Sequence, residues 1–114
     1  MSEPKIDPQL ALRRMWENAP ALARAKAERV YLEEYRKSLK AILMQKAQQA
    51  GAKSSAEQER DAYAHNDYQI HLAALRDAVE AEELLRWRMV KDQAAIEVWR
   101  SQESSARAMD RGTA

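Results

Sequence analysis

Apolar side chains recur at spacings of three and four along two long stretches of the chain, which is the pattern of helices with one buried face. In the first stretch the apolar positions are Leu22, Ala25, Leu32, Tyr35, Leu39 and then Ile42 or Leu43. In the second they are Tyr68, Leu72, Leu75, Val79, Leu85, Met89, Ile96 and Trp99, with Glu82 on the same line. No segment alternates with period two, so we predict an all-α fold.

Capping and breaking residues set the expected bounds of the first two helices. Asp7 followed by Pro8 is typical of a helix start, and Asn18-Ala19-Pro20 is typical of a break, because proline disfavours helix in the residue before it. These signals predict a short helix at residues 8–17. A long helix at residues 20–50 should follow, with Gly51 as its C-terminal stop.

Similar signals follow in the second half. Ser54 and Glu57 have the spacing of a capping box, which predicts a connector helix at residues 55–64. His65-Asn66-Asp67 reads as a turn, and Asp67 caps a second long helix at residues 68–108. Residues 109–114 should fray. The elements predict one helical domain over residues 1–114, an antiparallel hairpin of two long helices with short N-terminal and connector helices.

Charged residues suggest how the two long helices align. Three basic residues of the first long helix would lie opposite three acidic residues of the second: Arg36, Lys37 and Lys40 opposite Asp77, Glu80 and Glu83. In this alignment Glu82 pairs with Arg36 or Lys40. We interpret these groups as solvated salt bridges between helices.

The tryptophans of the second long helix lie on different faces. Trp87 and Trp99 are about 120° apart around a helix, at 100° per residue. Trp99 is on the main apolar line and is predicted to be core. Trp87 heads a second apolar line with Val90, Ala94 and Val98. A hairpin covers only one side of this helix, so the second line should pack on the short helix or another protomer, or expose Trp87 for base stacking. We predict a homo-oligomer built through these four residues.

Composition and charge narrow the classes of function. The chain of 114 residues has 2 Gly, 3 Pro and no Cys, which is typical of long helices and excludes disulfides and thiol chemistry. The net charge is only +1, but residues 1–50 carry +4 and residues 51–114 carry −3. Any nucleic-acid surface must therefore be local.

Basic residues gather at the expected open end of the hairpin. The candidates for nucleic-acid binding are Arg13, Arg14, Arg24, Lys26, Arg29, Arg100, Arg107 and Arg111. With Trp16 nearby, this set resembles a site for a phosphate backbone. The alternative interpretation is a solvated helix end with ordinary basic bias.

No motif for catalysis is present. The chain lacks a Gly-rich phosphate loop and a nucleophile elbow, and His65 and His71 are six residues apart, not the four of a helical metal pair. We read His65 as a turn residue and His71 as a neighbour of the core. The acidic residues near 80 read as a solvated face. We expect no enzyme, no cofactor and no metal site.

Three segments together resemble a known type of protein: "ARAKAERVYLEEYRKSLKAILMQKA", the polar connector "ERDAYAHNDY" and the Trp-Arg segment "AIEVWRSQESSARA". In layout and composition, residues 20–108 are similar to small helical phage proteins of recombination and replication clusters, and to UvsY-type recombination mediators of tailed phages. The resemblance implies an oligomeric ring that binds single-stranded DNA and helps to load a recombinase onto strands covered by single-strand-binding protein.

Two functions therefore stand as expectations. The first is a non-enzymatic, single-stranded DNA-binding recombination mediator or accessory protein. The alternative is an oligomeric helical adaptor or assembly protein, such as a phage chaperone or an inhibitor of a host protein, without nucleic-acid binding. The polar N-terminus and the lack of a long apolar run predict no membrane association. We expect a cytoplasmic location, in the host cell if a phage encodes the chain.

Overall fold

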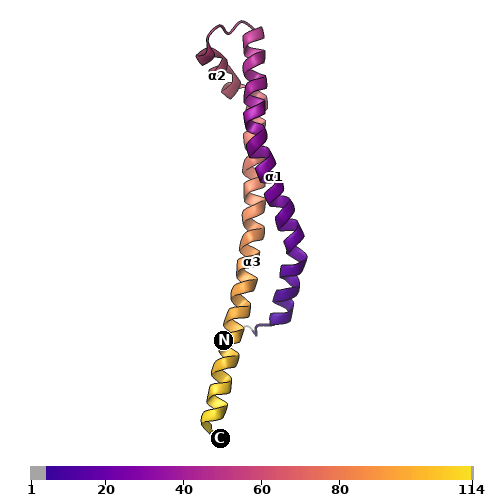
Figure 1. The fold of residues 1–114 in the computed structure, drawn as a ribbon, viewed down its shortest axis with the longest axis vertical. Coiled ribbons are helices and arrows are strands. Elements are labelled where there is room, and N and C mark those ends of the chain that lie inside the picture. The colour runs from indigo at the N-terminus through magenta and orange to yellow at the C-terminus, as the bar shows by residue number, and fades with distance from the viewer. Residues whose placement is uncertain (1–4, 114) are drawn as a thin grey trace. The chain divides into compact units, whose positions relative to one another are not determined.

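The computed structural model describes residues 5–113, which form three helices (Figure 1). Helix α1 covers Pro8–Gln49, α2 covers Ser55–Ala64 and α3 covers Asn66–Thr113. Residues 5–113 contain no strand, so the predicted all-α class is confirmed. The two long helices, α1 and α3, pack against each other, and their pairing is compatible with the predicted hairpin.

Helix α1 begins and ends with the predicted signals but has no break. The Asp7 carboxylate accepts hydrogen bonds from the amides of Gln9 and Leu10, at 3.0 and 3.1 Å. The prediction of a break at residues 18–20 is wrong, because α1 continues through Pro20. An internal proline leaves the carbonyl four residues earlier without its helical donor. Here that residue is Trp16, which lies on an exposed side of the helix.

Gly51 ends α1 for a conformational reason. Its φ is +114°, a value that residues with a Cβ rarely adopt. The Gly51 amide donates to the Gln48 carbonyl and the Ala52 amide donates to the Ala47 carbonyl. These two bonds form a Schellman motif, which pairs carbonyls at the end of the helix.

Short-range hydrogen bonds also position α2 and the start of α3. Ser54 caps α2 by accepting from the Glu57 amide, and the Glu57 carboxylate accepts from the Lys53 amide. Helix α3 starts two residues before the predicted position. The His65 ring, rather than the Asp67 carboxylate, acts at this start by accepting from the Asp67 amide. Helix α3 also continues to Thr113, where fraying was predicted from residue 109; Ala114 lies outside the described residues.

The described chain divides into two compact units. We call residues 24–82 the central unit, and residues 5–23 together with residues 83–113 the terminal unit. In the central unit, Leu43 of α1, Ala62 of α2 and Tyr68 of α3 form the buried cluster, with Leu39, Met44 and Leu72 packed against it. Helix α2 lies beside the end of α1 and the start of α3 (Figure 1). Three helices therefore contribute to this core, whereas two meet elsewhere.

Most of the less exposed positions of α3 follow a seven-residue repeat with two positions in each repeat. They are Tyr68, His71, Leu75, Ala78 and Glu82 in the central unit, and Leu85, Met89, Asp92, Ile96 and Trp99 in the terminal unit. This spacing is that of a coiled-coil contact line. Val79, which was predicted on the apolar line, is more exposed than its neighbour Ala78. Of the two choices left open on α1, Leu43 is buried and Ile42 is exposed, and Tyr35 is exposed as well. The contact line of α3 includes three polar residues.

Candidate interaction surface

Each of the three polar residues on the α3 contact line has a partner on α1. His71 Nε2 donates to the carbonyl oxygen of Leu32 at 2.7 Å. Glu82 pairs with Arg29, and Asp92, only 2 % exposed, lies 3.8 Å from the guanidinium of Arg14. Buried polar groups are stable only when they are paired. These contacts therefore favour one alignment of α1 on α3 within each unit.

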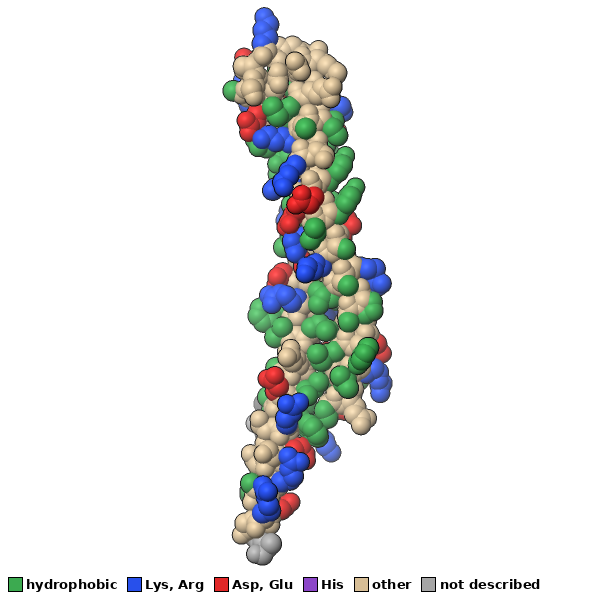
Figure 2. Space-filling model, in the orientation of Figure 1, with side chains coloured by type: hydrophobic (Ala, Val, Ile, Leu, Met, Phe, Trp, Pro, Cys, Tyr) green, Lys and Arg blue, Asp and Glu red, His purple; other side chains and the backbone are tan. Residues whose placement is uncertain are grey.

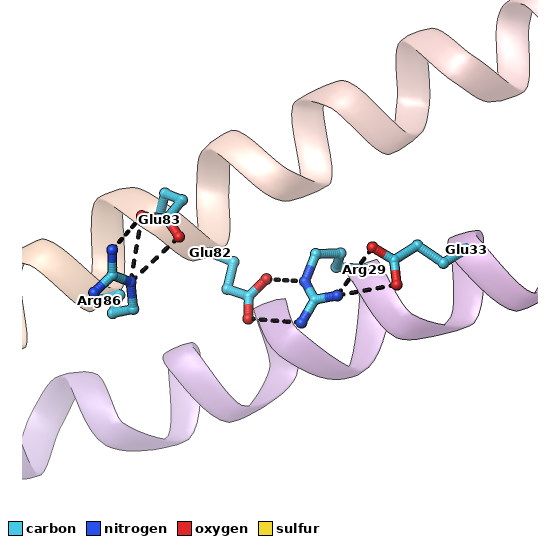
Figure 3. Close-up of polar contacts among 5 residues, drawn as sticks. All are labelled: Arg29, Glu33, Glu82, Glu83 and Arg86. Carbon is cyan, nitrogen blue, oxygen red and sulfur yellow. Dashed lines mark hydrogen bonds and ion pairs between the residues drawn. The ribbon is translucent and has the colours of Figure 1, made fainter.

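The Arg29–Glu82 pair changes the role of a predicted binding residue. Arg29 Nε and Nη2 donate to the two carboxylate oxygens of Glu82, and Nη1 lies 3.0 Å from both oxygens of Glu33 (Figure 3). Hydrogen bonds to Glu82, and next to Glu33, raise the pKa of Arg29. Arg29 therefore holds the helices together instead of belonging to an open basic patch. The predicted pairing of Glu82 with Arg36 or Lys40 is wrong.

The other predicted basic residues are exposed. Arg13, Arg14, Arg100, Arg107 and Arg111 belong to the terminal unit, whereas Arg24 and Lys26 belong to the central unit. Arg14 has its contact with Asp92. The remaining six form no ion pair within residues 5–113. They can approach an anion without first breaking a salt bridge, but their assembly into one surface stays a prediction.

The second apolar line of α3 is exposed in the terminal unit. Trp87 is 58 % exposed and Val98 is 47 % exposed, and Val90 and Ala94 are also exposed. The Arg86 guanidinium lies over the Trp87 ring, 4.9 Å from its centroid. Beyond Trp87, an open groove continues along α3 past Ala94, Val98, Ser101, Ser105 and Met109. The start of α1 leaves Trp87 exposed.

Helix α1 adds apolar surface to the same unit. A shallow depression is lined by Leu12, Met15, Trp16 and Ala19, and Trp16 is 75 % exposed. Figure 2 shows hydrophobic side chains gathered on one face over both helices of this unit. Trp99, by contrast, is half-buried and borders residues 5–9, which are the start of α1 and the three residues before it. Its position on the contact line agrees with the predicted core role.

The central unit holds a polar cluster that was not predicted. The Lys40 ammonium lies 2.9 Å from Glu59 and 4.8 Å from the centroid of the Tyr63 ring. Contact with Tyr63, and next with Glu59, raises the pKa of Lys40, and the hydrogen bond from Lys40 lowers the pKa of Glu59. The predicted alignment had placed Lys40 against α3. The helical patterns carry no signal that α2 would reach it.

Within the described residues no group of three or more histidine or acidic side chains could hold a metal ion. None of the helices in residues 5–113 is both long and apolar enough to span a bilayer. No protein-family model matches the chain, and neither the curated proteins nor the solved structures contain a significant match to it.

Proposed function

We propose that the chain is a non-enzymatic helical assembly protein that forms a homo-oligomer through the exposed apolar line of α3. The observation that carries this proposal is the exposure of Trp87 and Val98 on the side of α3 that faces away from α1. A helix that is apolar on two sides needs two covering surfaces. A contiguous exposed apolar surface is typical of a protein interaction site.

Light scattering after gel filtration tests the assembly. We expect the wild type to be oligomeric at about 50 µM, a concentration at which a micromolar interface is occupied. The double variant Trp87→Gln/Val98→Gln should be monomeric and equally helical. Val79→Gln is the matched control, because Val79 is an exposed α3 residue of the central unit, and it should stay oligomeric. A monomeric wild type at this concentration would refute the proposal.

A second candidate function is binding of single-stranded DNA by the assembled protein, as a recombination mediator that helps to load a recombinase. The observation that favours it is the set of exposed cations without ion pairs, of which Arg13, Arg100, Arg107 and Arg111 lie in the terminal unit. The described residues of this unit carry nine basic and seven acidic side chains, a formal charge of +2. So small a surplus gives weak binding per chain, and repetition around an oligomer strengthens it.

Fluorescence anisotropy of a labelled oligonucleotide tests this second function. Contacts to phosphates lose affinity steeply with salt, so binding at about 50 mM should largely disappear at about 300 mM. Arg100→Ala/Arg107→Ala should bind weakly yet remain oligomeric. Arg76→Ala is the control, because Arg76 is exposed but paired with Asp77 in the central unit. If the protein is oligomeric but does not bind the oligonucleotide at low salt, the DNA-binding function is excluded and the proposed assembly remains.

A further inference from the structure

Three basic residues of α1 line a hollow in the central unit that the other two helices complete. Arg36, Lys37 and Lys40 lie within little more than one helical turn. Tyr63 of α2 and Tyr68 of α3 form the rest of the lining. The hollow has a volume of about 350 Å³, which falls in the range of sites for small ligands.

The hollow has more positive than negative charge. Lys37 lies 3.4 Å from Glu34 and Lys40 lies 2.9 Å from Glu59. Arg36 forms no ion pair or hydrogen bond through its side chain within residues 5–113. Three cations therefore meet two carboxylates, and the guanidinium is the group without a partner.

Comparison with Arg29 shows what Arg36 lacks. The two arginines are seven residues apart on α1, which is close to two helical turns, so their side chains leave the helix on the same side. Arg29 meets the carboxylates of Glu82 and Glu33, whereas the hollow beside Arg36 is lined by Lys37, Lys40 and two tyrosines. An anion that entered the hollow would supply the missing partner.

We propose that this hollow binds the phosphate group of a phosphate ester, with Arg36 as the main donor. The planar guanidinium presents paired N–H groups that match phosphate oxygens. Lys40 is already fixed between Glu59 and Tyr63, so little side-chain freedom is lost when it acts as a second cation. Tyr63, packed edge-on against Tyr68 with ring centroids 5.2 Å apart, is partly exposed and offers an aromatic surface to a base. This inference does not depend on the proposed assembly.

Amide chemical shifts of the ¹⁵N-labelled full chain, titrated with inorganic phosphate at constant ionic strength, test the site. We expect saturable shifts at residues 36–40, 63 and 68. Arg36→Gln removes a charged donor and should weaken binding about tenfold or more. Arg76→Gln, an exposed arginine of the same unit outside the hollow, should bind as the wild type does. Equal binding by Arg36→Gln, or shifts spread evenly over all basic segments, would overturn the proposal.

Two further titrations identify the source of the phosphate. A nucleoside monophosphate that binds more tightly than phosphate, and loses that advantage in Tyr63→Leu, supports a free nucleotide. An oligonucleotide whose binding depends on Arg36 supports a nucleic-acid strand. In the alternative outcome the strand binds through Arg100 and Arg107 alone, while inorganic phosphate causes no shifts. That result refutes the hollow but leaves the second candidate function intact. Saturable binding of phosphate without binding of the strand supports the hollow and refutes the second candidate function.

Discussion

Leu43→Ala is the most direct test of the core, because Leu43 is the largest apolar side chain that the structure buries completely. It is 2 % exposed and contacts the cluster at which all three helices meet. The change removes three carbon atoms from this cluster, which costs about 2.5 kcal/mol in transfer free energy. The remaining cavity adds to the loss, within the usual range of about 2–5 kcal/mol. The buried cluster is small, so its neighbours can close part of the cavity, and we expect a loss of about 3 kcal/mol.

Urea unfolding followed by circular dichroism at 222 nm measures this loss. With a slope of about 2 kcal/mol per molar urea, the midpoint should fall by about 1.5 M. Ile42→Ala is the control, because Ile42 is the next residue and is 43 % exposed. It should cost about 1.4 kcal/mol or less, in proportion to the smaller area that it buries. Leu43→Met keeps the volume and should cost less than about 1.5 kcal/mol.

The difference between the stability losses of Leu43→Ala and Ile42→Ala shows which of the two residues is buried in the core. If Leu43→Ala and Ile42→Ala destabilise the protein equally, Leu43 is no more buried than Ile42, which would contradict the structure. A large loss for Ile42→Ala with a small loss for Leu43→Ala would place Ile42 in the core instead.

Three further predictions concern the backbone and the charges. Gly51→Ala should lower the free energy of unfolding by about 1–3 kcal/mol, because the φ of Gly51 is +114°. Gly112→Ala, one residue before the end of α3, should be neutral or stabilise the fold by less than about 1 kcal/mol, and a loss as large as that of Gly51→Ala would contradict the backbone assignment. Pro20→Ala restores an amide donor inside α1 and should gain about 1–3 kcal/mol, and an unchanged melting temperature would argue against the continuous helix. Because Lys40 lowers the pKa of Glu59, this pair stabilises the fold above the ordinary carboxyl pKa and its contribution is lost as pH falls. Melting temperatures from about pH 6 to about pH 3 should therefore fall more for wild type than for Glu59→Gln, and parallel curves would disprove the contribution of the pair.

The sequence was sufficient to predict the helices because their signals are local. Spacings of three and four, the Asp7 and Ser54 caps and the stop at Gly51 all act within a few residues. Pro20 was misread for a reason that is not local. Proline disfavours a helix interior, but the packing of both ends of α1 against α3 outweighs a defect that lies in an exposed turn.

The alignment of the two long helices was not predictable in the same way. An apolar line that repeats every seven residues fits its partner equally well when one helix slides by seven residues. Sequence reasoning paired Glu82 with Arg36 or Lys40, and the structure pairs it with Arg29, seven residues before Arg36. Because Glu82 was assigned to another residue, Arg29 had no predicted partner and was included in the basic surface. The exposure of Trp87 followed from its angular position alone and did not require the alignment.

Helix α2 has a consequence for this choice between alignments. A shift by one repeat, about 10 Å along the axis, would bring Arg36 to Glu82 and Leu43 to Leu75, so apolar contacts and an ion pair between α1 and α3 would survive. The contacts of α2 would not survive, because Lys40 would leave Glu59 and Leu43 would leave Ala62. The slipped pairing is thus a discrete competing state, disfavoured both by the contacts of α2 and by Asp92, which would lose Arg14. A chain with α2 replaced by a flexible linker of equal length should populate the slipped pairing more than the intact chain does.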